Sequence, residues 1–318
     1  MALTLSLRAM SVAEMSVAAG DLRESLEARL SRLDGRGAVA ARSLRTGEAL
    51  LIEPDAEMPS ASLIKMPIAM ALQEDVAGGR VSRDEVLGCE GHTADHLAYE
   101  MIRTSDNEAT NLLTQRIGMD RINRFMESKG LRGTRMRRLM LDWEARQRGD
   151  ENVTTARDML SVLGDVARGG DLHPLRRAML DQHYRTRIPA VVPGECVIAN
   201  KTGELDDVVH DAAILYTPFG TVLAVIMLSE LTSVADGEET CRVVASEVCA
   251  HFARGALHLS GDLGPVLVDG GGPRETPCTI WVGPSVQQPV TCRVRVPGVS
   301  LTASVDLRSG DRLALSGR

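Results

Sequence analysis

Three short motifs, far apart along the chain, constrain how it can fold. They are Ser62-Leu63-Ile64-Lys65, Ser105-Asp106-Asn107 and Lys201-Thr202-Gly203. The chain has 318 residues and 36 basic side chains, of which only Lys65, Lys129 and Lys201 are lysines. Arginine stays protonated, whereas the pKa of a lysine falls readily on burial, so that a lysine can act as a base. We therefore expect the fold to bring the three motifs together in one site, because they follow the order found in a known type of catalytic site.

The scarcity of lysine also has a neutral explanation. In a gene rich in guanine and cytosine, arginine codons can replace most lysine codons, so that the remaining lysines are accidental. An isolated Ser-x-x-Lys pair occurs by chance in most proteins. Three motifs in one order are much harder to obtain by chance, so we interpret them as a single set.

The composition excludes several classes of function. With 44% hydrophobic and 25% charged residues it is typical of a soluble globular protein. A formal net charge of −7 offers no basic surface for nucleic acid or an anionic membrane, and 3% aromatic residues argue against base stacking. The six cysteines show no Cys-x-x-Cys spacing, so we expect no zinc site. We predict no metal or organic cofactor, and no nucleic-acid or membrane partner.

Targeting signals are also missing from the sequence as it stands. No apolar run approaches the roughly 18 to 20 residues that span a bilayer. The first residues lack the positive and apolar regions of a secretion signal. A cytoplasmic location is therefore the expectation.

The order of predicted elements favours two lobes. Helical periodicity appears over 21–33, a two-stranded hairpin over 37–52, and mostly helical signals from 63 to 194. Within that helical stretch we expect helices over 68–74, 108–116, 121–129, 155–168 and 175–183. Strand signals return over 196–200, 212–216 and 221–228, and a helix follows over 238–254. We predict an α/β (α+β) two-lobed fold, in which an antiparallel sheet flanked by helices packs beside an all-helical lobe, with the site at their junction.

Ser62 and Lys65 lie three residues apart at the start of a predicted helix, so their side chains share a face and can touch. A serine hydroxyl is a weak nucleophile until a neighbour removes its proton, and a lysine desolvated in a cleft can be that base. The helix start adds backbone N–H groups that favour developing negative charge. Pro67 fits the first turn of such a helix.

The other two motifs have a structural and a catalytic interpretation. Ser105-Asp106-Asn107 precedes a predicted helix and alone would be interpreted as an N-cap. In a catalytic site, Ser105 could relay a proton to the leaving group and Asn107 could hold a substrate amide. Lys201 follows a predicted strand and would contribute fixed positive charge, while Gly203 would let substrate backbone approach the strand edge.

With these motifs the chain resembles the penicillin-recognising serine hydrolases, specifically the class A β-lactamase branch. The resemblance covers roughly 21–254 and includes Asn111-Leu112-Leu113 after the second motif. It implies a β-lactamase/transpeptidase-like fold in which Ser62 is the acylated nucleophile, Lys65 its base and Ser105 the proton shuttle.

The resemblance also implies a substrate-binding set. Asn107, Lys201 and Thr202 would bind substrate, beside Gly203. The backbone N–H groups of Ser62 and Glu204 would form the oxyanion hole, where losing one donor costs a factor of about a hundred to a thousand. The acyl substrate would be a small molecule or a peptide-like compound.

We predict two units along the chain. A β-lactamase-like hydrolase domain would span 21–255, with its sheet lobe built from 21–60 and 195–255 and its helical lobe from 61–194. Beyond Gly255, short alternating runs separated by Gly and Pro predict a small β-rich extension over 256–318.

The first departure from the family concerns release of the acyl group. Class A β-lactamases hydrolyse their acyl-enzyme with a water held by a glutamate in a Glu-x-x-x-Asn stretch. An ungapped comparison places Met140 where that glutamate belongs. Asp142 and Glu144 are the candidate deacylation bases; the alternative, which we favour, is a structural charge pairing of both with Arg146 around Trp143.

The second departure follows the third motif. Where β-lactamases have small residues and then a base for the substrate carboxylate, this chain has Glu204, Asp206, Asp207 and His210. An acidic rim would repel a carboxylate and suit a neutral or cationic acyl donor. A solvated acidic turn explains Asp206 and Asp207 equally well, and His210 is more simply explained as a structural histidine.

Together these features predict a serine hydrolase that acts through a Ser62 acyl-enzyme on an amide, ester or β-lactam. Weak or no classical β-lactamase activity is expected, because the acylating groups are complete and the deacylating glutamate is not in place. One alternative is an acyltransferase that passes the acyl group to an amine. Another is a β-lactam or peptide sensor that stays acylated. The sequence does not fix the oligomeric state.

Overall fold

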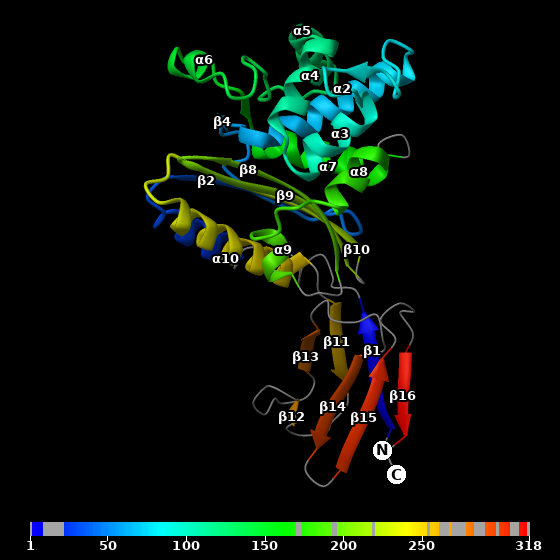
Figure 1. Cartoon of the computed structure of the whole chain (residues 1–318). Coiled ribbons are helices and arrows are strands. Elements are labelled where there is room, and N and C mark those ends of the chain that lie inside the picture. The colour runs from blue at the N-terminus through cyan, green and yellow to red at the C-terminus, as the bar shows by residue number, and fades with distance from the viewer. Residues whose placement is uncertain are drawn as a thin grey trace.

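The computed structural model describes residues 2–8, 22–169, 173–192, 196–217 and 220–252, and a set of strands between 255 and 316. Its α+β architecture has a helical lobe stacked on an antiparallel sheet, as the sequence predicts (Figure 1). The helix over residues 22–30 and α10 (Val234–Phe252) cover the opposite face of that sheet. The two segments that build the sheet lobe therefore meet in space although more than a hundred residues of helical lobe separate them.

Five strands form the main sheet, in the order β3-β2-β10-β9-β8. They are β2 (Arg36–Ser43), β3 (Ala49–Ile52), β8 (Val197–Leu205), β9 (Val208–Thr217) and β10 (Gly220–Ser229). Alternate residues face the two layers of helices, so that Ala38 and Ala40 join one buried cluster and Val39 and Ala41 the other. The order leaves β8 at the edge of the sheet.

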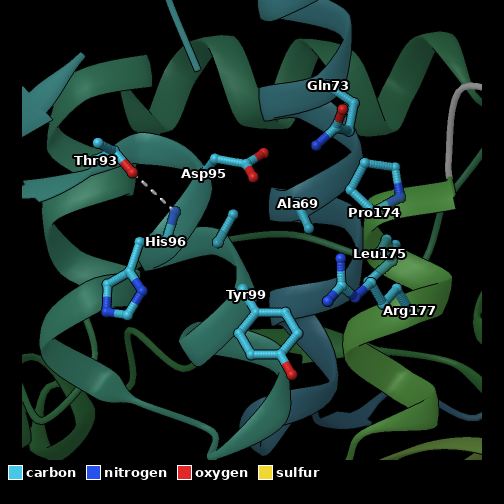
Figure 2. A pocket seen from close by; sticks show the side chains of 10 residues that line it. Ala69, Gln73, Thr93, Asp95, His96, Tyr99, Pro174, Leu175 and Arg177 are labelled. Atoms are coloured by element: carbon cyan, nitrogen blue, oxygen red, sulfur yellow. Dashed lines mark hydrogen bonds between the residues drawn. The ribbon is translucent and has the colours of Figure 1, made fainter. Parts of the chain in front are cut away.

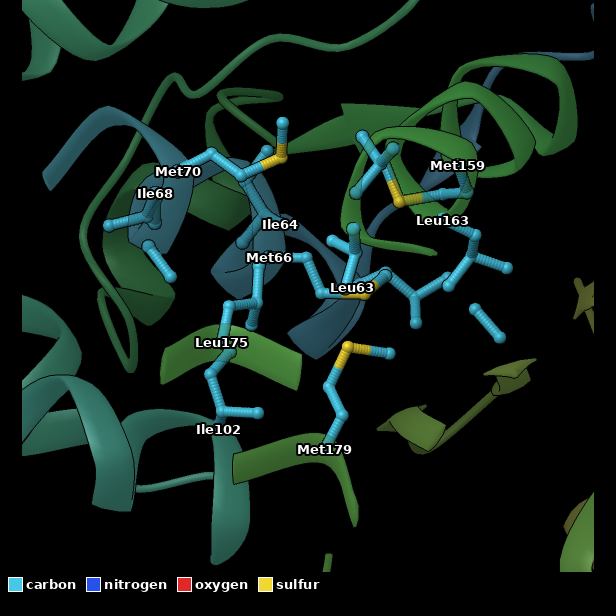
Figure 3. Packing of buried hydrophobic residues seen from close by; sticks show 14 of the residues in the cluster. Leu63, Ile64, Met66, Ile68, Met70, Ile102, Met159, Leu163, Leu175 and Met179 are labelled. Atoms are coloured by element: carbon cyan, nitrogen blue, oxygen red, sulfur yellow. The ribbon is translucent and has the colours of Figure 1, made fainter. Parts of the chain in front are cut away.

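The helical lobe is organised around α2 (Lys65–Ala77), which is buried on almost every side. Around it lie α3 (Ala94–Arg103), α4 (Asn107–Ile117), α5 (Met119–Ser128), α7 (Ala156–Arg168) and α8 (His173–Leu180). Figure 3 shows Met66 and Met70 packed with Met159, Met179 and branched aliphatic side chains. Methionine has three rotatable bonds and fills irregular gaps, so one long helix can contact several others at different angles.

Every helix predicted from periodicity in this lobe is present, and α3 and α6 (Trp143–Gln147) are additional. The remaining short elements are β4 (Met58–Pro59), η1 (Ala61–Ile64), β5 (Val86–Leu87), β6 (His92–Thr93), β7 (Val153–Thr154) and α9 (Ile188–Val191). A helix of five residues, such as α6, is too short to carry a periodic signal. No helix among the described ranges is long and apolar enough to cross a membrane.

A group of further strands follows α10. β11 (Gly255–Ser260), β13 (Cys278–Val282) and β16 (Arg312–Ser316) share a sheet with β1 (Ala2–Arg8), in the order β13-β11-β1-β16. β12 (Leu267–Val268), β14 (Val290–Val296) and β15 (Val299–Val305) form a second sheet. The strand β1, which the sequence interpretation missed, therefore pairs with strands that follow the hydrolase-like region (Figure 1).

Candidate active site

The turn that carries Ser62 is held in an unusual conformation. Ser62 lies in η1, immediately before α2, and is partly exposed. The preceding Ala61 has φ +44°, a left-handed value that costs energy for any residue except glycine. A backbone hydrogen bond from Ser60 N to Asn152 O (2.7 Å) holds the start of this turn. Ser62 is therefore presented on a constrained backbone rather than on a flexible loop.

The third motif lies against that turn. A Cβ added to Gly203 would meet Ala61 Cβ at 3.2 Å and Ser60 O at 3.3 Å. A larger residue at position 203 would therefore require β8 or the Ser62 turn to shift. The prediction that Lys201 follows a strand is wrong in one respect: Lys201 to Gly203 lie inside β8, because pairing with β9 continues to Leu205.

A buried polar network joins all three motifs. Lys65 Nζ donates to Ser105 O (2.6 Å), to Ser105 Oγ (3.2 Å) and to Asn107 Oδ1 (2.7 Å). Lys201 Nζ donates to the same Ser105 Oγ (2.9 Å) and to Thr202 O (2.8 Å). Both lysines have 0% of their surface exposed. Ser105 thus links the two ammonium groups, as expected if the three motifs form one site.

Burial changes the acidity of both lysines. Desolvation lowers the pKa of Lys65 to about 7, and the nearby Asp106 charge opposes the shift. Desolvation and then the Lys65 charge lower the pKa of Lys201, while Asp211 opposes this. Lys65 therefore has the acidity of a base that works near neutral pH. The surroundings of Lys201 act against the fixed positive charge that we expected of it.

The second motif combines a helix cap with the network. Asp106 is the N-cap of α4 and accepts a hydrogen bond from Ala109 N (2.8 Å), as its position predicts. Ser105 has φ +60°, which turns its carbonyl and its hydroxyl toward Lys65. In the described part of the chain, Asn107 Nδ2 makes no hydrogen bond, so this amide nitrogen stays available to a ligand.

The segment expected to supply a deacylation base is built differently. Asn111 clamps the backbone of Met140, accepting from Met140 N (2.8 Å) and donating to Met140 O (3.0 Å), and the Met140 side chain is buried. Asp142 is the N-cap of α6 and accepts from Ala145 N (2.9 Å), while Glu144 is exposed on that helix. Within the described residues neither carboxylate bonds to the lysine network.

Charged pairs hold this loop, residues 138–152, in place. Arg138 and Arg146 both pair with Glu151 (2.7 and 3.0 Å), and their guanidinium groups lie about 6 Å from the ring centre of Trp143. Arg146 also reaches Asp207 in the β8–β9 turn (3.2 Å). The expected pairing around Trp143 is thus present for Arg146, but its carboxylates come from Glu151 and Asp207, not from Asp142 or Glu144.

His210 and Asp211 are structural groups beneath the site. His210 Nδ1 accepts from Leu228 N (3.1 Å), so Nε2 carries the proton and donates to Pro59 O (2.8 Å). Burial lowers the pKa of His210 to about 4 and raises that of Asp211 to about 6. Asp211 accepts from Ile188 N (3.0 Å) and Asn200 Nδ2 (3.1 Å). His210 thus ties β9 to the chain just before Ser62.

Arg187 is a residue near the site that sequence reasoning missed. Its side chain is 2% exposed and lies beneath β8, where it forms ion pairs with Glu204 and with Glu238 (3.2 Å). It also donates to Gly203 O (3.1 Å) and His210 O (3.0 Å). Nothing in the local sequence separates this arginine from the many others, because its partners come from distant segments.

A separate pocket of about 460 Å³ lies on the helical lobe, between α2, α3 and α8 (Figure 2). Figure 2 shows Arg177 pointing into it near Tyr99, whose hydroxyl donates to Asp181 (2.9 Å). That hydrogen bond raises the pKa of Tyr99. The lining residues include Ala69 and Gln73, on the helix that begins with Lys65, but no member of the three motifs. The pocket is therefore distinct from the motif site.

Comparisons with known proteins agree with this geometry. A family model described as the beta-lactamase enzyme family matches residues 21–252. The beta-lactamase regulatory protein BlaB of Streptomyces cacaoi is 25% identical over 280 residues, covering 67% of this chain and 90% of BlaB.

Solved structures show the same fold. PBP-A is 26% identical with a TM-score of 0.66, over 72% of this chain and 94% of PBP-A. A mutant of PBP-A, 25% identical over 72% of this chain and 95% of its own with a TM-score of 0.66, has been solved as an acyl-enzyme complex with penicillin G. A reconstructed last common ancestor of class A β-lactamases from Gram-negative bacteria is 24% identical with a TM-score of 0.68, over 73% of this chain and 99% of its own.

Proposed function

Because the protein belongs to the beta-lactamase enzyme family, with a match over more than half of its length, we propose that it forms a covalent acyl-enzyme on Ser62. The acyl donors would be amides, esters or β-lactams. Release of the acyl group to water would be slow. The observation that carries the proposal is the buried network around Lys65, which lies three residues after Ser62 and has a pKa of about 7. Lys65 and Lys201 both donate hydrogen bonds to the hydroxyl of Ser105.

The proposed reaction uses these groups in sequence. Ser62 Oγ forms a bond to the carbonyl carbon of the donor while its proton moves to the neutral amine of Lys65. The bond from that carbon to the leaving nitrogen or oxygen then breaks, and the leaving atom takes a proton from Lys65 through the Ser105 hydroxyl. The backbone N–H groups of Ser62 and Glu204 would stabilise the oxyanion. Asn107 and Thr202 would bind the donor beside Gly203.

Slow release follows from what surrounds the network. All hydrogen bonds of Lys65 Nζ in the described residues go to Ser105 and Asn107, and none goes to a carboxylate. Water needs a general base to attack an ester at neutral pH, and such a base contributes about a hundredfold to ten-thousandfold. Asp142 is engaged as a helix cap and Glu144 is exposed. Acylation is thus supported by more of the site than hydrolysis is.

Intact-protein mass spectrometry tests this proposal directly. The protein is incubated with benzylpenicillin and, separately, with a phenylacetyl thioester, and its mass is followed over time. We expect an adduct that is absent from Ser62→Ala and from Ser105→Ala at short times. An Ser62→Ala protein that is still acylated at the wild-type rate would overturn the assignment of the nucleophile.

A second candidate function is an acylated sensor, and the relation to a protein named as a beta-lactamase regulatory protein favours it. The same experiment separates the two. A hydrolase loses its adduct with turnover of the donor, whereas a sensor keeps the adduct for hours. If an added amine shortens the lifetime and appears in the product, the protein transfers acyl groups.

A further inference from the structure

Arg187 presents a buried positive charge beneath the strand that borders the site. Its guanidinium bridges β8 and β9 by donating to Gly203 O (3.1 Å) and His210 O (3.0 Å). A guanidinium removed from water needs an anion, and Glu204 supplies one by an ion pair with the outer nitrogen of Arg187. Glu238 forms a second ion pair with the same nitrogen at 3.2 Å. Arg187 therefore has two carboxylate partners, and Glu204 is the more exposed of the two.

The two members of this pair have very different surroundings. The Arg187 side chain is 2% exposed, whereas the Glu204 side chain is 61% exposed. Glu204 directly follows Gly203, where an added Cβ would lie 3.2 Å from Ala61 Cβ in the turn that carries Ser62, and β8 is an edge strand of the sheet. Glu204 is thus an exposed carboxylate that pairs with a buried cation next to the third motif of the candidate site. A ligand anion that replaced the Glu204 carboxylate could pair with Arg187.

The other acidic residues of this rim do not have that role. Asp207 is paired with Arg146 (3.2 Å) from the 138–152 loop. Asp206, the next acidic residue along, is exposed and makes no hydrogen bond or ion pair within the described residues. Of these three acidic residues, only Glu204 pairs with Arg187.

We propose that Glu204 determines specificity by filling the anion-binding face of Arg187 with the protein's own carboxylate. The site then favours acyl donors that are neutral or cationic at this point over donors that carry a carboxylate there. The proposal rests on the proposed acyl-enzyme function for its biological meaning. Its physical basis, a guanidinium that an anion can bind once Glu204 is removed, does not depend on any reaction.

A binding experiment tests that physical basis. Phenylacetate and its neutral match phenylacetamide are titrated into wild type, Glu204→Ala and Asp206→Ala, with calorimetry as the readout. We expect phenylacetate to bind Glu204→Ala at least about tenfold more tightly than wild type, because the substitution removes one of the two carboxylates that pair with a buried cation. Phenylacetamide should bind all three proteins alike. Equal gains in phenylacetate affinity in Glu204→Ala and Asp206→Ala would show that only the total negative charge of the turn matters, which would overturn the proposal. No gain in affinity in Glu204→Ala would also overturn it. If Glu204→Ala does not fold, Glu204→Gln takes its place.

A covalent experiment then links the binding to the reaction. The rate of adduct formation is measured by intact mass with benzylpenicillin and with its methyl ester. We expect wild type to prefer the ester and Glu204→Ala to shift the acid-to-ester ratio by about tenfold toward the acid. An unchanged ratio in an acylated variant would contradict the specificity role. If no protein is acylated by either donor, the Ser62 proposal fails, and the binding experiment still decides whether Glu204 covers an anion site.

Discussion

The lysine network, formed by Lys65, Ser105, Asn107 and Lys201, and the 138–152 loop differ in how they hold their charges. In the network, two fully buried lysines meet at one serine hydroxyl, and burial lowers the pKa of both. In the loop, Arg138 and Arg146 share Glu151, and Glu144 remains exposed. The first arrangement lowers the pKa of two amines, whereas the second holds a backbone in place. The two lysines of lowered pKa therefore lie in the network and not in the loop.

The largest expected effect of a substitution is at Lys65. Lys65→Arg removes the only base with a pKa of about 7 in the described network, and we expect acylation to slow by at least about a hundredfold to ten-thousandfold. Lys201→Arg should retain part of the activity, because it keeps a cationic donor in the site. Stopped-flow or mass-spectrometric acylation rates measure both. Equal losses would show that the two lysines do not differ in role.

The pH dependence of acylation sharpens the same contrast. The acting form of Lys65 is the neutral amine, whose fraction rises with pH through its pKa of about 7. Acylation should therefore increase about tenfold per pH unit below that value and level off above it. A rate profile between pH 5 and 9, with Ser62→Ala as the blank, checks this. A midpoint near the ordinary lysine value would mean that burial does not tune Lys65.

We expect a substitution that loosens the 138–152 loop to lower the free energy of unfolding and not to change a pKa. Asn111→Ala removes two hydrogen bonds to the backbone of Met140, and we expect a loss of about 1–3 kcal/mol in the free energy of unfolding. Asn123→Ala is a matched control, because Asn123 clamps Met136 in the same way (2.8 and 2.9 Å). Urea denaturation should give similar losses for the two variants. Only Asn111→Ala should speed tryptic cleavage after Arg146 or Arg148, and equal cleavage would refute a local anchor.

The smallest effect is expected at Glu144. Glu144→Gln should leave the lifetime of the acyl-enzyme within about twofold of wild type, because an exposed carboxylate outside the network cannot position a water. The adduct lifetime is measured by mass after removal of free donor. A lifetime lengthened by tenfold or more would make Glu144 the deacylation base and erase the contrast between the two regions.

Local patterns predict the parts of this molecule that depend on neighbouring residues. The helix start at the first motif and the cap at Asp106 are correct because each involves a single turn of helix. β1 was missed although Leu3, Leu5 and Leu7 alternate with Thr4 and Ser6, a signal typical of a strand.

Contacts between distant segments carry no such signal. Arg187 acquires its role from residues 16 to 51 positions away, and Asn111 clamps a residue 29 positions away. Gly203 was expected to admit substrate, whereas its lack of a side chain already serves the close approach of Ala61. The motifs therefore predict which residues share the site, and the fold decides which partners tune them.

The pairing of β1 bears on how the chain is made. Thr4 pairs with Ser260 and with Ala314, so β1 finds its partners only after the whole hydrolase-like region has been synthesised. That region has its own buried clusters, so we expect it to fold before β1 has a strand to pair with. We therefore expect assembly in two stages during translation. The hydrolase-like region would be completed first, and the sheet that contains β1 would form afterwards.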